Sequence, residues 1–392
     1  MIARRPTKRA AVMTGVGLLL ILVASTAQAG WLFVLAAGVL APIAASLVTR
    51  HHLARATVER SVPERTRLGS DVRVGVTLTA PATAPLPLGR LEDDFRAFEP
   101  ISVGFDRTPS GRAQHIELVR KAWRRGVFDD GTIRLITGAP FGLVRAHTHR
   151  VVASPMTVVP TWAELTTFPI LEPSSSPSDV VHERARTGAG EEYMGVRDYR
   201  PGDPRKFVHW RSTARAGRLI VREYEQEVAS RVGLVLAGAD HGTAPDSSFE
   251  MLVSAMASIG LYALSTGHPL DAVRADPDGA EHLGSPGRHE LLDWLAAAQP
   301  TDVPLIGLVN HVLVRIGRRG TVVLLVPDSG VAGTSVKDAV TAVQGAGARA
   351  IVVIARADSW VEGSSPVSVD LAVRAAVRYL QRGQDLASCL QG

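Results

Sequence analysis

A short stretch near the middle of the chain gathers residue types that could carry acid–base chemistry. It holds two aspartates, a histidine and a series of arginines. An aspartate together with a histidine can do general acid–base work. A hydrolase or transferase that uses Asp203 and His209 is therefore one hypothesis. The polar residues of this stretch are Arg197, Asp198, Asp203, Arg205, His209, Arg211 and Arg215.

Local structure explains the same residues in another way. Pro201 and Gly202 suit the two corners of a turn, because proline fixes φ and glycine accepts a positive φ. Asp203 then suits a helix N-cap, and a helix is expected over residues 204–215, with Gly217 as its C-terminal stop.

One face of this expected helix is apolar. Phe207, Trp210 and Ala214 fall on it, which predicts that they pack inward, whereas Arg205 and Arg211 lie elsewhere. Structural ion networks often imitate active sites. The pattern therefore favours a structural brace or a partner-binding surface over catalysis.

The run also resembles the bacterial family called domain of unknown function 58, through its Arg-x-Tyr-x-Pro-Gly-Asp segment and the residues after it. The position before the tryptophan is commonly Asp in that family, whereas His209 stands here, so no carboxylate is available at that position. Ala214 also fits the family pattern. The predicted partner-binding or structural segment comprises Arg197, Tyr199, Pro201, Gly202, Asp203, Arg205, His209, Trp210, Arg215, Arg222 and Glu223.

The resemblance implies a role that depends on contact. Members look like membrane proteins whose C-terminal half resembles a von Willebrand factor type A domain. Relatives are often encoded with MoxR-type AAA+ ATPases and transglutaminase-like membrane proteins. The resemblance thus implies a non-enzymatic adaptor with a MoxR-type ATPase as its partner and a transglutaminase-like membrane protein as a further candidate.

Type A domains often hold Mg²⁺ through an Asp-x-Ser-x-Ser loop after their first strand. Here Ala237, Ala239 and His241 stand at the corresponding positions. Alanine has no ligand atom, whereas Mg²⁺ requires oxygen ligands. Asp240 and Asp328 are the nearby carboxylates, and neither completes a set. We expect a degenerate site that holds no metal, and no cofactor.

Two apolar runs at the N-terminus predict a membrane anchor. Residues 10–29 and 31–48 carry no charge, and each approaches the length of about 20 residues that a membrane-spanning helix needs. Basic residues flank both outer ends, so the positive-inside rule predicts a two-pass cell-membrane protein with its large domains in the cytoplasm. The flanking residues are Arg4, Arg5, Lys8 and Arg9 before the runs, and Arg50, Arg55 and Arg60 after them.

Residues 1–29 fit a second interpretation. A basic start, an apolar run and Ala27-Gln28-Ala29 also suit a cleaved secretory signal. The second apolar run would still anchor the mature chain, with the same orientation.

The charge balance argues against nucleic acid as a partner. The net charge is +5, of which four positive charges precede the first apolar run, so little excess remains elsewhere. Binding through the Arg-rich helix would instead predict a steep loss of affinity with salt. The lone cysteine, Cys389, excludes a disulfide framework.

Periodicity divides the rest of the chain. We expect a membrane anchor over residues 1–50, a β-sandwich over 55–165, a linker carrying the polar segment over 166–228, and a doubly wound type A-like α/β domain over 229–392. Val72, Val74, Val76 and Leu78 alternate with polar or small residues, as in a half-buried strand. In the last domain we expect strands at 232–237, 269–274, 321–326 and 350–355, and helices at 249–264, 289–298, 336–344 and 371–381.

Overall fold

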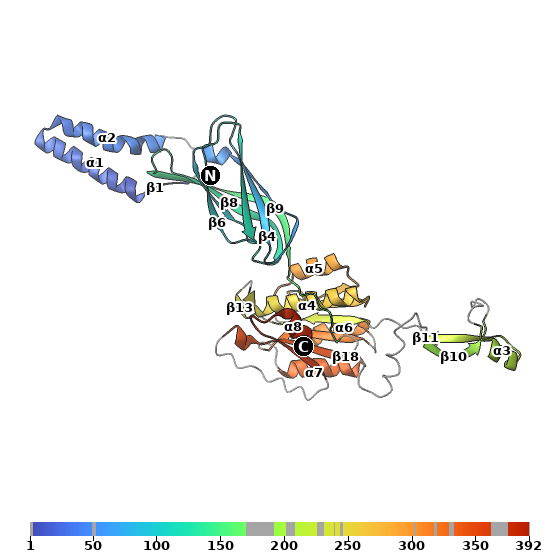
Figure 1. The fold of residues 1–392 in the computed structure, drawn as a ribbon. Coiled ribbons are helices and arrows are strands. Elements are labelled where there is room, and N and C mark those ends of the chain that lie inside the picture. Colours follow the sequence, from blue (N-terminus) through green and yellow to red (C-terminus); the bar gives the residue numbers. More distant parts are fainter. Residues whose placement is uncertain are drawn as a thin grey trace. The chain divides into compact units, whose positions relative to one another are not determined.

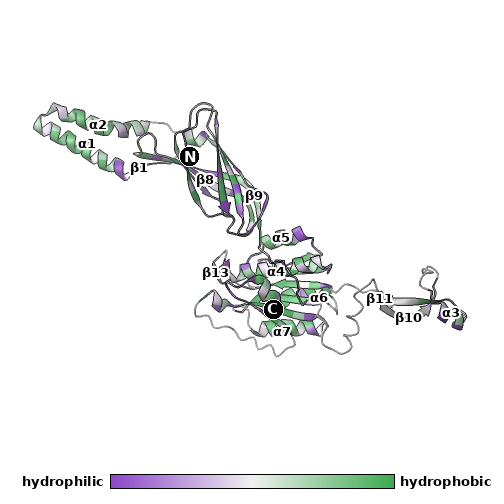
Figure 2. Cartoon of the chain, viewed as in Figure 1, coloured by the Kyte–Doolittle hydropathy of each residue, from purple (hydrophilic) through white to green (hydrophobic). Residues whose placement is uncertain are grey.

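Two hydrophobic helices at the N-terminus form a hairpin, α1 (Lys8–Ala27) and α2 (Gly30–Val48). Gln28 makes the turn between them with a left-handed φ of 49°. Both helices are long and apolar enough to cross a membrane, which confirms the predicted pair (Figures 1 and 2). The structure is a computed structural model that describes residues 3–48, 52–169, 192–200, 208–225, 231–238, 240–243, 246–301, 303–316, 320–328, 333–361 and 375–391.

The hairpin depends on one close approach between its helices. Gly17 of α1 is buried against Leu40 of α2, and a Cβ atom at Gly17 would lie 2.5 Å from a methyl carbon of Leu40. Gly15, two residues earlier, has nothing within 4 Å of such a Cβ atom. Small residues let membrane helices pack closely, so Gly17 sets their separation.

Residues 57–159, together with β1 near the N-terminus, form two β-sheets around one core. The larger sheet has the order β1-β9-β8-β5-β6, with β3 also pairing with β9, and the smaller has the order β2-β4-β7. Alternate residues of β4, from Val72 to Leu78, are buried against Leu91, Ile133 and Met156 of the other sheet. The elements are β1 (Ala3–Pro6), η1 (His52–Arg55), β2 (Thr57–Ser61), β3 (Arg65–Arg67), β4 (Asp71–Thr79), β5 (Gly89–Asp94), β6 (Ile101–Phe105), β7 (Ala113–Lys121), β8 (Gly126–Thr137) and β9 (Val144–Val159).

A six-stranded sheet of mixed direction forms the second large part of the fold. Its order is β16-β15-β12-β17-β18-β19, and every neighbouring pair is parallel except β15 with β16. Helices α6 (Leu305–Ile316) and α7 (Gly333–Gly345) share its core (Figure 1). The strands are β12 (Val232–Leu236), β15 (Leu270–Asp276), β16 (Gly279–Gly284), β17 (Thr321–Pro327), β18 (Arg349–Ala355) and β19 (Ala376–Leu380), and the short β13 (Gly242–Thr243) pairs with β14 (Asp246–Ser247).

The helices around this sheet are mostly those that the sequence predicts. A third apolar helix, α4, is also long enough to cross a membrane, but 67% of it is buried inside the fold, which makes it a core helix. The sequence pattern does not predict the helix α6. The helices are α4 (Ser248–Ser265), α5 (Arg288–Ala296), α6 (Leu305–Ile316), α7 (Gly333–Gly345), η4 (Ala357–Ser359) and α8 (Leu386–Gln391).

The helix expected over residues 371–381 is wrong for its second half, where the chain forms β19. Residues 371–374 lie outside the described residues. β19 pairs in parallel with β18, from Ile351 opposite Ala376 to Ala355 opposite Leu380. Val377 and Tyr379 lie two residues apart, a spacing typical of a strand and not of one helix face, and Ala376 to Leu380 pair with the sheet edge.

The described residues divide into two units by their internal contacts. The first unit comprises Met1–Trp162, His241–Ala257 and His289–Gln299, and the second comprises Ala163–Asp240, Ser258–Arg288 and Pro300–Gly392.

Arg125 forms several hydrogen bonds within the first unit to residues far away in the sequence. Its guanidinium forms a double ion pair with Glu250, at 2.9 Å from Nε and 2.8 Å from Nη2. Its Nη1 donates to the carbonyl oxygens of Leu295, Ala296 and Ala298 at the end of α5.

Candidate functional site

The polar segment that the sequence singles out forms a small module of two strands and a helix. β10 (Glu192–Asp198) pairs with β11 (Ile220–Glu225) in antiparallel register, and α3 (Trp210–Ala216) precedes β11. Val208 bridges to Val221, and both side chains are buried together with Ile220. Backbone pairing thus brings β10, the residue before α3 and β11 into one module.

The pairing of β10 with β11 fixes the positions of several residues of the predicted segment. Arg197 lies opposite Val221, while Arg222 lies opposite Val196 and Glu223 opposite Gly195. The amide of Tyr199 donates to the carbonyl oxygen of Leu219 at 2.9 Å, which extends the pairing by one residue. The predicted residues Pro201, Gly202, Asp203 and Arg205 lie outside the described residues.

His209 caps the helix. Its Nδ1 accepts the amide of Ser212 at 3.3 Å and lies 2.7 Å from the Ser212 hydroxyl. Its own amide donates to the carbonyl oxygen of Ile220 at 2.8 Å. Residues 204–207 of the expected helix lie outside the described residues, and the expectation is wrong for Val208 and His209, because α3 begins at Trp210. At the other end, Gly217 takes a φ of 65° and its amide bonds Thr213, as its predicted stop role requires.

Trp210 does not pack inward. Its side chain is 67% exposed, which corrects the expected inward-facing side of the helix. α3 begins only at Trp210, after the cap at His209, so a face drawn for a longer helix does not apply. Val196 and Leu219 are also more than 40% exposed in this module. Exposed cations accompany them at Arg211, Arg215 and Arg218, of which Arg218 pairs with Asp198 at 3.1 Å.

Beyond this module, the carboxyl end of the six-stranded sheet offers one unusual carboxylate. Asp328, directly after β17, is buried, and its Oδ1 accepts the amide of Ala357 at 2.7 Å. Its Oδ2 has no hydrogen-bond partner among the described residues. Ligands in α/β folds often bind at this end of the sheet, where the strand order reverses.

The positions expected to hold a divalent cation do not supply a set of ligands among the described residues. Ala237 is a buried methyl group, and Ala239 lies outside the described residues. The ring of His241 lies 3.3 Å from the hydroxyl of Ser248. No group of three or more histidine, cysteine, aspartate or glutamate side chains that could hold a metal occurs within the described ranges.

A comparison with family models matches the part of the chain that contains both the β10–α3–β11 module and Asp328. Residues 195–359 match the model described as "Protein of unknown function DUF58". This region belongs to the DUF58 family. The DUF58 region runs from within β10 to the end of η4, so it contains Trp210, His209 and the carboxyl end of β17.

Two of the solved structures that match the chain are only weakly similar to it. An alkylpurine DNA glycosylase, AlkC, from Pseudomonas fluorescens, bound to DNA containing an abasic site analogue, has 16% identity and a TM-score of 0.14, over 25% of this chain and 30% of that one. A β-glucosidase from Listeria innocua in complex with gluconolactone has 12% identity and a TM-score of 0.14, over 26% of this chain and 16% of that one.

This chain therefore spans less than a third of either protein's length, and at these TM-scores neither likeness bears on its fold or function. No curated protein matches the chain.

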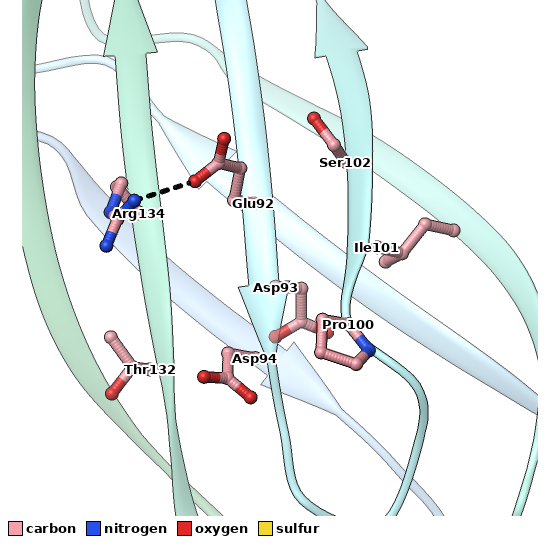
Figure 3. A pocket seen from close by; sticks show the side chains of 8 residues that line it. All are labelled: Glu92, Asp93, Asp94, Pro100, Ile101, Ser102, Thr132 and Arg134. Atoms are coloured by element: carbon pink, nitrogen blue, oxygen red, sulfur yellow. Dashed lines mark hydrogen bonds and ion pairs between the residues drawn. The ribbon is translucent and has the colours of Figure 1, made fainter.

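Outside the DUF58 region, a cavity of about 300 Å³ opens on the larger sheet of the first unit (Figure 3). Glu92 and Arg134 face each other across neighbouring strands in an ion pair of 3.1 Å. The cavity is lined by Glu92, Asp93, Asp94, Pro100, Ile101, Ser102, Thr132 and Arg134.

Beneath this cavity, Asp93 is fully buried between two arginines. It pairs with Arg60, and it lies 2.5 Å from Nη1 of Arg120. The two guanidinium groups stand over the rings of Phe95 and Phe98, at 4.7 and 4.8 Å. Desolvation by burial lowers the pKa of Arg120, although Asp93 opposes the shift. The geometry supports a structural role, because each buried charge has a partner or an aromatic face.

This network corrects the expected role of Arg60. Its side chain is buried, so it does not belong to the basic flank of the membrane helices. Nothing local in the sequence marks Arg60, Arg120 or Arg125 as buried, because their hydrogen-bond partners lie at least 21 residues away.

Proposed function

We propose that the protein is a non-enzymatic membrane adaptor, which presents the module of β10, α3 and β11 to a protein partner. The observation that carries this proposal is the exposure of Trp210 within the DUF58 region. Burial of an exposed tryptophan by a partner contributes a large share of the binding free energy, because its apolar surface is large. Tryptophan and arginine are also enriched in binding hot spots. Arg211 and Arg215, both exposed, supply such arginines.

The contacts of His209 weaken the alternative of a hydrolase or transferase. A general base needs a ring nitrogen that is free to reach the substrate. Nδ1 of His209 accepts the Ser212 amide, so the neutral ring carries its proton on Nε2 and has no lone pair free to take a proton from a substrate. Its proposed partner Asp203 lies outside the described residues.

The favoured partner is a MoxR-type AAA+ ATPase, through the resemblance of the sequence to the wider family. A transglutaminase-like membrane protein is a second candidate from the same source. A cytoplasmic ATPase requires the DUF58 region to face the cytoplasm. Contact with such a partner requires no metal, cofactor or nucleic acid.

The strand pairing at both ends of the hairpin supports this orientation. β1 joins the larger sheet directly before α1, and β2 joins the smaller sheet soon after α2. Both ends of the hairpin therefore lie on one side of the membrane. The exposed Arg5, Lys8, Arg9 and Arg55 mark that side as cytoplasmic by the positive-inside rule.

The same pairing supports retention of the N-terminal residues. Cleavage after Ala29 would remove β1, whose four residues pair with β9 from Val144 to His147. Loss of an edge strand would expose the edge of the larger sheet. We therefore propose that residues 1–29 form part of the mature two-pass anchor.

The sheet order supports a type A-like domain in the C-terminal half. An order in which β12 lies at the centre, with β15 and β16 to one side and β17, β18 and β19 to the other, is that of a doubly wound fold. We propose that this domain lacks the metal loop of its relatives, since Ala237 has no ligand atom.

The adaptor proposal is tested by the affinity of the full-length protein in nanodiscs for the purified ATPase. Trp210→Ala is expected to weaken binding on the order of thirtyfold, because truncation of an anchor residue costs about 2 kcal/mol or more. Trp210→Phe should keep part of the affinity. Val314→Ala is the matched control, because Val314 is an apolar side chain 85% exposed outside this module.

Two results would overturn the proposal. One is an unchanged affinity of Trp210→Ala with an unchanged melting temperature. The other is that the unaltered protein does not bind the ATPase with ATP, ADP or no nucleotide.

A further inference from the structure

Two arginines stand directly opposite each other at the membrane end of the larger sheet. Arg5 of β1 is the cross-strand partner of Arg145 of β9. Both side chains are exposed, and neither forms an ion pair with any other part of the chain that the structure describes. Like charges placed directly opposite in a sheet are destabilising unless an anion lies between them.

The arginine pair is fixed close to the first membrane helix. Thr7 separates β1 from α1, and its amide donates to the carbonyl oxygen of Leu143 at 2.9 Å. Its hydroxyl donates to the same oxygen at 3.0 Å. Lys8 and Arg9, in the first turn of α1, are exposed, and Figure 2 shows that turn as the hydrophilic end of an otherwise hydrophobic helix.

Two large apolar side chains are exposed beside these cations. Phe141, in the loop between β8 and β9, is 58% exposed, and the neighbouring Gly142 accepts the Thr7 hydroxyl at 3.3 Å. Leu88 is 64% exposed, and its carbonyl oxygen accepts the hydroxyl of Thr137, where the same loop begins. Phenylalanine and leucine are among the side chains that enter the boundary between headgroups and acyl chains in interfacial segments.

We propose that these residues form a binding surface for anionic lipid headgroups, which we name the lipid rim. Arg5 and Arg145 hold a lipid phosphate between their guanidinium groups, which relieves their mutual repulsion. Phe141 and Leu88 enter the interfacial layer beside it. The lipid rim comprises Arg5, Lys8, Arg9, Leu88, Phe141 and Arg145.

The position of the lipid rim favours a membrane lipid over a soluble anion. Arg5, Lys8 and Arg9 lie in or next to the first turn of a membrane helix, and strand pairing places Arg145 beside Arg5. The headgroups of the same leaflet are therefore the nearest phosphates. A soluble phosphate would leave the apolar side chains of Phe141 and Leu88 exposed to water, whereas a lipid layer would cover them. The proposal requires only that the hairpin crosses a bilayer, so it stands or falls separately from the adaptor role.

The test compares lipid association by spin-label spectroscopy of the full-length protein in vesicles. The motionally restricted fraction is measured for spin-labelled phosphatidylglycerol and for spin-labelled phosphatidylcholine. Arg145→Gln is the informative variant, because Arg145 lies far from the helix in sequence. Arg73→Gln serves as the matched control, because it removes the same charge from an exposed position. Arg73 lies near the start of β4, whereas the end of β4 at Thr79 pairs with Thr57, soon after α2.

The unaltered protein is expected to prefer phosphatidylglycerol severalfold, with the preference falling as salt is raised. Arg145→Gln should remove most of this preference, and Arg73→Gln should retain it. Because Arg145→Gln also relieves the repulsion with Arg5, its melting temperature should not fall.

Three outcomes would overturn the proposal. The first is equal association of the two lipids with the unaltered protein. The second is an equal loss of preference in Arg73→Gln. The third is full displacement by inorganic phosphate at matched ionic strength, which would assign the arginine pair to a soluble anion.

Discussion

Arg125 and Glu250, which lie 125 positions apart in the chain, form a double ion pair that is almost sheltered from water. The arginine follows β7, and the glutamate lies in the first turn of α4. The remaining guanidinium nitrogen of Arg125 bonds three carbonyl oxygens at the end of α5. One side chain therefore satisfies both a buried carboxylate and a helix end.

Replacement of Arg125 should be strongly destabilising. Arg125→Gln leaves Glu250 charged and nearly buried, at a cost of about 3 kcal/mol. The exposed neighbour Arg124 has no such contact, and Arg124→Gln should change stability by less than about 0.5 kcal/mol. Denaturant unfolding of the purified full-length variants measures both effects. Equal stabilities would show that the ion pair is not formed.

His209 should act as a helix cap and not as a base. His209→Ala removes the acceptor for the Ser212 amide and should cost about 1 kcal/mol. Asparagine is a good cap, so His209→Asn should restore most of that loss. Binding to the ATPase should follow stability in both variants. A cellular activity lost in His209→Asn at full stability would instead favour acid–base chemistry.

The hairpin should be sensitive to volume at Gly17 and insensitive at Gly15. Gly17→Val places a side chain against Leu40 and should destabilise by about 1–3 kcal/mol through overpacking. Gly15→Val meets open space and serves as the control. Thermal unfolding in a single mild detergent compares the two. Equal tolerance would mean that the helices do not approach at Gly17.

Cys389 should react slowly with alkylating reagents in the folded protein. Burial, and then the charge of Asp385, raise the pKa of its thiol, so little thiolate exists near neutral pH. Because the folded pKa is above the unfolded one, the stabilising contribution is present at lower pH and is lost as the pH rises through the folded pKa.

Alkylation rates across pH test this prediction for Cys389. The folded chain should react more slowly than the unfolded chain at pH 8. Asp385→Asn should speed the reaction, while its side chain can still cap α8 through the Ser388 amide. A rate in the native protein equal to that of unfolded chain would contradict the raised pKa.

Long apolar patterns could be predicted from the sequence, because burial depends there on composition alone. The expected spans at residues 10–29 and 31–48 differ from the two helices by only a few residues. The continuous apolar run at 232–237 and the period-two pattern from Val72 to Leu78 likewise become strands. The resemblance that pointed to the DUF58 region also depended on a contiguous run of residues.

The remaining features depend on contacts between distant residues. Arg60 looks like a juxtamembrane cation until β2 turns it toward Asp93 of β5. The amide of His209, directly before α3, bonds the carbonyl oxygen of Ile220 in β11. A prediction from local capping residues does not include this contact. The facing of Arg5 and Arg145 needs the register of β1 on β9, and these residues are 140 positions apart.

Orientation decides whether the DUF58 region can meet a cytoplasmic partner at all. Trypsin digestion of right-side-out and inverted vesicles, followed with an antibody against the C-terminal residues, measures it directly. The hairpin geometry predicts that the C-terminal part is protected in right-side-out vesicles and cleaved in inverted ones. Cleavage from the outer side of right-side-out vesicles that remain sealed would contradict it.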